Sequence, residues 1–150
     1  MPGSAPGQFS APEGVATDGA GNVYIADRVN NLVQKFTTDG VFISAWGSHG
    51  TGDGQFATLW GIAVGPNGHV FTTDVGNSHI QEFTADGAFV SRWGSGGSGP
   101  GQFNFPLGIA VDGNGDAYVD DDGNYRIQKF GSGATPVRLG SWGSLKQRYR

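Results

Sequence analysis

The segment GIAVDGNGDAYVDDDGNYRIQKF (residues 108–130) decides the fold of this chain, because two further versions of it occur earlier in the sequence. They are GVATDGAGNVYIADRVNNLVQKF (14–36) and GIAVGPNGHVFTTDVGNSHIQEF (61–83), and each version begins 47 residues after the one before it. Self-similarity at a period of about 40 to 50 residues is typical of repeat architectures, in which each unit buries its apolar face against its neighbours. The sequence therefore predicts three successive copies of one structural unit.

The repeat continues on both sides of this segment. The tripeptide Gly-Gln-Phe precedes each version and a tryptophan follows each one, the third arriving two residues later than the period predicts. We expect the tryptophans to pack between neighbouring units and the phenylalanines to enter the same core, because large aromatic side chains dominate core energetics. The tripeptides are at 7–9, 54–56 and 101–103, and the tryptophans are Trp46, Trp93 and Trp142.

Each unit has the pattern of four short strands. In the first unit, β-forming runs at 14–18, 23–27, 32–36 and 41–46 are separated by turns, and Asp39-Gly40 is a strong hairpin signal. Four antiparallel strands without a helical period are typical of a propeller blade, so we predict an all-β fold of four-stranded antiparallel blades, three in this chain. Two sets of glycines fit this interpretation, one needing positive φ in the first hairpin and one crowded near the axis. They are Gly21, Gly68 and Gly115, and Gly14, Gly61 and Gly108, respectively.

Composition narrows the classes of function. The chain is 37% hydrophobic, 12% aromatic and 15% charged, with 28 glycines, which suits a folded β protein. Cysteine is absent, so disulfides and thiolate metal sites are excluded. The net charge is −4, and because three of the nine basic residues lie in the last six positions, the repeat region is more acidic still, which disfavours nucleic acid as a partner. No apolar run approaches the roughly 20 residues of a membrane span, and nothing in the sequence indicates a cellular compartment.

The three versions of the 108–130 segment resemble the NHL repeat, and the resemblance covers essentially all of residues 7–144. It implies a β-propeller, usually of six blades, and a role as a protein- or RNA-binding module. Related propellers include lyases and lactone hydrolases with a metal on the axis, so the resemblance implies a fold more firmly than a function. The residues that depart from the expected proline, arginines and aspartate of the repeat are Leu59, Leu32, His79 and Gly65.

Three blades do not close a ring, because propellers have about four to eight blades and closure protects the strand edges. We therefore expect a homodimer of six blades, with a fragment of a longer propeller as the alternative. The third unit ends irregularly near Pro136, and the Gly-Ser run 94–99 has the composition of a flexible connector, so Gly97 should tolerate valine better than Gly68. The expected divisions are a leader 1–6, blades 7–53, 54–100 and 101–144, and a basic tail 145–150.

Candidate binding residues lie where the repeats differ. The loops between the second and third strands, and those before the first strand, are expected to open on one face of a propeller. On them Trp60 is the only tryptophan outside the periodic series, and Asp120-Asp121-Asp122 is the densest run of charge. Asp121 recurs as Asp27 and Asp74 and is expected to cap its loop, whereas any ligand site should bring Trp60 together with the other two aspartates. The predicted ligand-binding residues are Glu13, Arg28, Trp60, Asp120, Asp122 and Tyr125.

No catalytic or metal site is evident in the sequence. His49, His69 and His79 occupy different places in the repeat, so we do not expect them to converge on one zinc ion. Residues 112–116 have some of the spacing of a calcium loop, but they align with an ordinary hairpin turn and lack the expected glycine and glutamate. No cofactor is therefore expected, with Ca²⁺ kept as an alternative.

These observations favour a non-catalytic interaction scaffold that binds a protein, a peptide or a small molecule on its loop-rich face and self-assembles from half-propellers. Enzyme activity is left open. The alternative is a metal-dependent lyase or lactone hydrolase with its site on the propeller axis. No contact with a membrane is expected.

Overall fold

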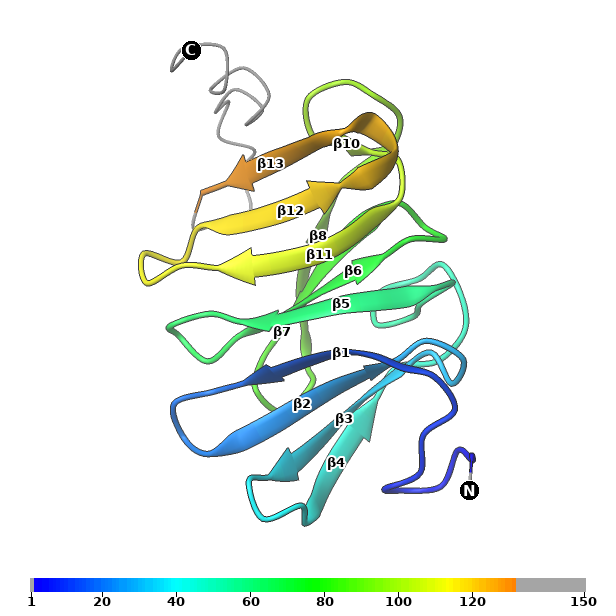
Figure 1. Ribbon diagram of the computed structural model, residues 1–150, viewed down its shortest axis with the longest axis vertical. Coiled ribbons are helices and arrows are strands. Elements are labelled where there is room, and N and C mark those ends of the chain that lie inside the picture. The colour runs from blue at the N-terminus through cyan, green and yellow to red at the C-terminus, as the bar shows by residue number, and fades with distance from the viewer. Residues whose placement is uncertain (1, 132–150) are drawn as a thin grey trace.

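The computed structural model describes residues 2–131, which form a stack of β-sheets along the longest axis of the molecule (Figure 1). Thirteen strands and one short 3-10 helix make up this part of the chain. No helix among these residues is long and apolar enough to span a membrane. The predicted all-β class is confirmed for the described residues.

The first two repeats each form a four-stranded antiparallel sheet whose strands are paired in chain order. This agrees with the antiparallel four-stranded blade that the strand pattern predicts. The first sheet consists of β1 (Pro12–Thr17), β2 (Asn22–Asp27), β3 (Leu32–Thr37) and β4 (Phe42–Trp46). The second consists of β5 (Leu59–Val64), β6 (Val70–Asp74), β7 (His79–Phe83) and β8 (Phe89–Trp93).

The third repeat forms a three-stranded sheet within the described residues. Its elements are β11 (Pro106–Val111), β12 (Ala117–Asp121), the 3-10 helix η1 (Asp122–Asn124) and β13 (Arg126–Phe130). A small parallel pair, β9 (Ser95–Gly96) and β10 (Gln102–Phe103), precedes it. The fourth strand expected for this blade falls outside the described residues, together with Pro136, Trp142 and the tail 145–150.

The blades stack through their first strands. β5 lies between β1 and β11, and the later strands of each blade lie farther from this row (Figure 1). The β2–β3, β6–β7 and β12–β13 connections lie along the right-hand edge in Figure 1, opposite the first hairpin turns on the left. The loops expected to share one face of the propeller therefore do so.

Trp46 and Trp93 pack between blades as predicted. Trp46, at the end of β4, has its ring centroid 5.9 Å from that of Phe83 in blade two and 6.2 Å from that of Tyr24 in its own blade. Trp93 lies 5.8 Å from Phe130 of blade three in the same measure. The phenylalanines of the second and third Gly-Gln-Phe, fully buried in the same two clusters, are Phe56 and Phe103.

Two of the three glycines expected near the axis are crowded. A Cβ at Gly14 would lie 2.9 Å from the carbonyl oxygen of Trp60, and a Cβ at Gly61 would overlap the carbonyl oxygen of Leu107. Gly108 is not crowded within the described residues, where no further blade follows it and a Cβ would meet only the side chain of Asp120, at 3.6 Å. The hairpin glycines are as predicted, with φ of 84° at Gly21, 80° at Gly68 and 84° at Gly115.

The Gly-Ser run 94–99 is not the flexible connector that its composition predicts. Part of it forms β9, and the N–H of Gly97 donates to the carbonyl of Phe103 at 3.0 Å. Gly97 has φ of 149°, and a Cβ there would overlap the side-chain amide of Gln102. Gly50, one period earlier, has φ of 155° and the same conflict with Gln55, so this loop is a recurring structural element.

Valine at Gly97 is therefore expected to be as destabilising as valine at Gly68. Gly68→Val places a β-branched residue at positive φ in open space, which costs about 1–3 kcal/mol of backbone strain. Gly97→Val adds a steric conflict with Gln102 to a comparable strain. Urea denaturation of both variants measures the two losses, and a Gly97→Val protein with wild-type stability would show that the loop is pliable after all.

Candidate functional site

A buried aspartate fixes the loop that enters each blade. In blade two, Asp74 is fully buried and accepts hydrogen bonds from the backbone N–H groups of Ala57 at 3.0 Å and Thr58 at 2.9 Å. It also accepts a hydrogen bond from the side-chain amide of Asn77 at 2.7 Å, and that amide donates to the carbonyl of Gly50 at 2.9 Å. The recurring aspartate is thus a loop cap, as the sequence predicts.

A recurring glutamine completes this loop clamp. Gln81 accepts a hydrogen bond from the N–H of Gly54 at 2.8 Å and donates to the carbonyl of Gln55 at 2.7 Å. Sequence reasoning missed this role, although the fixed spacing from each Gly-Gln-Phe to the glutamine carried the signal. The equivalent clamp residues are Asp27, Asn30 and Gln34 in blade one, and Asp121, Asn124 and Gln128 in blade three.

In blade one the clamp also lowers the pKa of its aspartate. Burial alone would raise the pKa of Asp27, but the backbone N–H groups of Ser10, Ala11 and Asn30 outweigh it and hold that pKa below its usual range. The carboxylate is therefore ionised at neutral pH and satisfied by donors from the loop. The negative charge of Asp27 therefore stabilises the loop that enters blade one.

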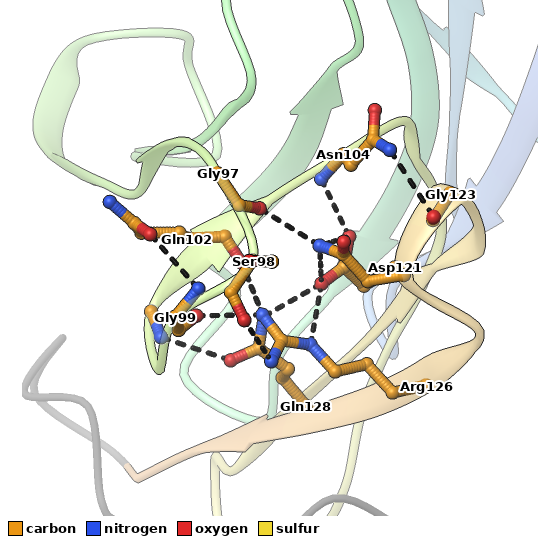
Figure 2. A network of polar contacts seen from close by, with 11 residues as sticks. Gly97, Ser98, Gly99, Gln102, Asn104, Asp121, Gly123, Arg126 and Gln128 are labelled. Atoms are coloured by element: carbon orange, nitrogen blue, oxygen red, sulfur yellow. Dashed lines mark hydrogen bonds and ion pairs between the residues drawn. The ribbon is translucent and has the colours of Figure 1, made fainter.

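Blade three adds an arginine to the clamp (Figure 2). Arg126, at the start of β13, donates from Nε to Asp121 Oδ2 at 2.7 Å. Its two terminal nitrogens donate to the carbonyls of Ser98 at 2.8 Å, Gly99 at 2.7 Å and Gln102 at 2.8 Å. A guanidinium suits this position because its donors form a rigid planar fork that reaches several acceptors at once.

Blade two has a histidine where blade three has this arginine. His79 is buried, and its Nε2 lies 3.7 Å from Asp74 Oδ2 without a hydrogen-bond partner among the described residues. Burial lowers the pKa of His79 and outweighs the opposing effect of the Asp74 charge. The imidazole is therefore neutral at pH 7, and its Nε2 has no hydrogen-bond partner among the described residues. The Thr51 carbonyl, equivalent to that of Ser98, accepts a hydrogen bond from Arg92 instead, at 3.0 Å.

We expect His79→Arg to stabilise the protein by about 1–2 kcal/mol, because charge-assisted hydrogen bonds to the loop would replace a buried ring without a partner. The pKa of His79 is lower in the folded chain, so the unfolded chain binds more protons below about pH 6.5 and wild-type stability falls with pH there. The gain should therefore grow between pH 7 and pH 5. Denaturation curves at both values check it, with Leu32→Met, at the equivalent position of blade one, as the control that adds no charge.

Three of the six predicted binding residues meet at the junction of blades one and two. Glu13 lies on β1, Arg28 follows β2 and Trp60 lies on β5. Arg28 Nε donates to Glu13 Oε1 at 2.8 Å, and the guanidinium carbon stands 5.6 Å from the centre of the Trp60 ring. These three residues, the junction cluster, present a cation, a carboxylate and an indole on the loop-rich face. A guanidinium next to an aromatic ring can bind a carboxylate and an adjoining apolar group.

The other three predicted residues lie on blade three. Asp120 lies on β12, Asp122 begins η1, and Tyr125 follows η1 with φ of 55° and 94% exposure. Burial raises the pKa of Asp120, and the charges of Asp122 and Asp121 raise it further. The predicted set is thus divided between the junction cluster and the third blade.

The three histidines do not come together. His69 Nδ1 lies 2.7 Å from Glu82 Oε1 beside the first hairpin of blade two, whereas His79 lies beside Asp74 and His49 lies in the loop that enters blade two. Within residues 2–131, no group of three histidine, aspartate or glutamate side chains is placed to hold a metal ion.

The segment with calcium-like spacing forms a hairpin turn. Asp112 Oδ1 accepts hydrogen bonds from the N–H groups of Asn114 at 2.9 Å and Asp116 at 3.0 Å, and Oδ2 accepts one from the hydroxyl of Tyr118 at 3.1 Å. Asp18 makes the same contacts in blade one, which supports the alignment with an ordinary turn.

The segments that contain the loop clamps match a known sequence family. The NHL repeat matches residues 9–36, 56–83 and 103–130, and each match contains the clamp residues of one blade. The chain belongs to the NHL repeat family. No curated protein matches it as a relative.

Solved structures similar to this NHL repeat chain include enzymes and a calcium-binding protein. A streptogramin B lyase superimposes with a TM-score of 0.68 at 22% identity, over 89% of this chain and 41% of that one. An inactive virginiamycin B lyase from Staphylococcus aureus with quinupristin gives 0.65 at 19% identity, over 87% and 42%. Regucalcin from Agrobacterium tumefaciens, a calcium-binding protein, gives 0.55 at 16% identity, over 77% and 42%.

Likeness at these identities shows the propeller fold alone. This chain spans about two fifths of the length of the three similar proteins, so it corresponds to part of their structure.

Proposed function

We propose that this chain is a half-propeller that closes a six-bladed ring with a second copy and serves as a non-catalytic interaction scaffold. The exposure of the outer face of blade one carries the proposal. Val15 is 67% exposed, whereas Ile62, at the same position in blade two, is 6% exposed and lies against Gly14 of blade one. Blade three of a second copy would cover Val15 in the same way.

The other end of the stack supports the same assembly. Thr73 donates its hydroxyl to the Leu107 carbonyl of blade three at 2.7 Å and accepts the N–H of Gly61 at 2.7 Å. Asp120 and Gly108 take the corresponding positions in blade three, beyond which the described part of the chain has no blade. In a two-fold ring each end meets the opposite end of the other copy, so that one contact is made twice.

The recurring polar side chains are hydrogen-bonded within the loop clamp, which favours a binding function over a catalytic one. The recurring aspartate, asparagine and glutamine of each blade are committed to the loop clamp, whereas the junction cluster is non-periodic and partly exposed. We propose that Glu13, Arg28 and Trp60 form the centre of a surface for a protein, a peptide or a small molecule that carries a carboxylate. Asp120, Asp122 and Tyr125 extend this surface in the closed ring.

A head-to-tail duplication of the chain tests the proposal. Joined in one polypeptide, the two halves should close on each other, so the tandem protein should have the mass of one tandem chain. Its urea midpoint should not depend on protein concentration, whereas the midpoint of the single chain should rise with concentration. A tandem protein that still associates with further copies would contradict the six-bladed ring.

Elemental analysis of the purified protein separates the scaffold from the alternative, a metal-dependent lyase or lactone hydrolase. The proposal expects no stoichiometric metal. One Ca²⁺ or Zn²⁺ ion per ring that survives dialysis would favour the enzyme.

A further inference from the structure

A pocket of about 330 Å³ opens on the face of blade one that no other blade covers among the described residues. Its walls are mainly apolar and come from the loop that enters blade one, from β2 and from the β3–β4 hairpin. The residues that define this tryptophan socket are Gly7, Phe9, Val23, Ile25, Phe36 and Gly40.

The same position in blade two is filled by a tryptophan. Phe83 corresponds to Phe36, and the Trp46 ring lies against it with 5.9 Å between ring centroids. Gly87 corresponds to Gly40, and a Cβ at Gly87 would overlap the Trp46 indole, whereas a Cβ at Gly40 would meet nothing within 4 Å. The two sites therefore share their construction, and they differ in that the site in blade two is occupied.

Blade three repeats the occupied arrangement. Trp93 of blade two lies 5.8 Å from Phe130, which corresponds to Phe36 and Phe83. Each described junction thus inserts the tryptophan of one blade against the third-strand phenylalanine of the next. The socket of blade one is the acceptor half of a third such contact.

The alternation along β2 shows which side chains the occupant would cover. Tyr24 and Ala26 face blade two and are fully buried. Val23 and Ile25 point to the other side and are only half-buried, although their equivalents in blade two, Val70 and Thr72, are fully buried beneath blade one. Val23 and Ile25 therefore line a pocket that is open in blade one, whereas the equivalent side chains of blade two are covered by the preceding blade.

We propose that the tryptophan socket of blade one binds the indole of Trp142 from a second copy of this chain, which deepens the proposed six-bladed assembly and rests on it. Two of the three periodic tryptophans are already placed in the described junctions, and Trp142 is the third in the series. Trp142 follows β13 in the sequence, outside the described residues, and β13 itself stands at the opposite end of the stack from β4 (Figure 1). In a two-fold dimer each copy supplies one indole and one socket.

Two substitutions on opposite sides of this contact provide the test. Ile25→Glu places a charge in the socket on a side chain that is half-buried in the single chain, and Trp142→Ala removes the proposed indole. Val29→Glu, at a 57% exposed loop position outside the socket, is the matched control for added charge. Sedimentation equilibrium measures the dimer dissociation constant of each protein, and circular dichroism checks that each keeps its β-sheet.

We expect Ile25→Glu and Trp142→Ala each to raise the dimer dissociation constant by at least about tenfold, because truncating or blocking an anchoring aromatic residue removes a hot spot. Val29→Glu should leave the constant within about twofold of wild type. An equimolar mixture of the two weakened variants should associate more tightly than either alone, because the mixed dimer restores one intact indole–socket pair. Variants damaged only in folding would not complement each other in this way.

The outcomes separate the socket from the dimer itself. If the wild-type chain is dimeric and both variants associate as tightly as wild type, the socket assignment is wrong and the ring proposal stands. If both variants weaken association but their mixture shows no recovery, the contact between this indole and this socket is likewise overturned. A wild-type chain that is monomeric at every concentration overturns the ring and the socket together.

Discussion

Trp46→Ala should destabilise the protein by about 3–5 kcal/mol. The Trp46 ring packs against Tyr24 of blade one and Phe83 of blade two, so its removal would take away aromatic contacts on both sides of this junction. Its Nε1 is buried and has no hydrogen-bond partner among the described residues, so the indole contributes through packing. Urea denaturation at a fixed protein concentration measures the loss.

Trp60→Ala is the matched control, because it removes the same type of side chain from a position outside the two hydrophobic clusters between the blades. Trp60 packs under Arg28 in the junction cluster, and we expect its loss to cost about 1 kcal/mol or less. Equal losses in the two variants would mean that Trp46 is not the wedge between the first two blades. Trp60→Ala also keeps the fold intact for tests of the proposed ligand surface.

Asp74→Ala should cost about 3–5 kcal/mol and lower the cooperativity of unfolding. Asp74 is fully buried, and its removal would leave the N–H groups of Ala57 and Thr58 without acceptors and release the side chain of Asn77. Each buried donor left without a partner costs about 1–3 kcal/mol. Denaturant titration gives the free energy, and amide exchange at residues 57 and 58 should become faster than in wild type.

Asp86→Ala is the control for loss of an aspartate. The Asp86 side chain is 93% exposed, and its partner Lys35 keeps a hydrogen bond to the carbonyl of Ala85 at 2.9 Å. Exposed ion pairs contribute about 0–1 kcal/mol, so this variant should be close to wild type. If Asp74→Ala proved equally mild, the loop clamp would not hold the blades as described.

The fold could be predicted from the sequence because the residues that shape the blade occur three times at a fixed spacing. Residues at equivalent positions of the repeats have the same structural role, as Trp46 and Trp93, Gly21 and Gly68, and the recurring aspartates show. Aligning the repeats therefore distinguishes residues with a structural role from residues that match by chance. Structural needs that recur leave a periodic signal, which is why the blade, its hairpins and its loop caps were all recognisable.

Features that depend on contacts across a loop, or on a neighbouring blade, were harder to predict. Gly108 occupies the position of a crowded glycine, but no blade lies next to it among residues 2–131. Gly97 has the composition of a linker, yet its hydrogen bond to Phe103 and its left-handed backbone depend on contacts across the loop. His79 is buried beside Asp74 with no hydrogen-bond partner for its Nε2 among the described residues, and a single sequence does not report burial.

The candidate site could be predicted only in part, for a similar reason. Non-periodic residues were identified by their departure from the repeat, and Glu13, Arg28 and Trp60 do meet. Glu13 and Trp60 lie on strands β1 and β5, however, and not on the loops where the sequence analysis places them. Their grouping follows from the stacking of β1 against β5, whereas Asp120 and Asp122 belong to the next blade. Whether Asp120 and Asp122 come near the junction cluster depends on whether a second copy joins the two ends of the stack, as in the proposed ring.

Light scattering on the native protein after size-exclusion chromatography tests the proposed six-bladed ring. Because the outer face of blade one has the form of one side of a blade junction, we expect a mass twice that of the 15.6 kDa chain, with no larger species at equilibrium. The outer face of blade one carries Val15 and Ile25, which should not remain exposed in solution. A well-folded monomer that keeps the 15.6 kDa mass at every concentration would contradict the closed ring.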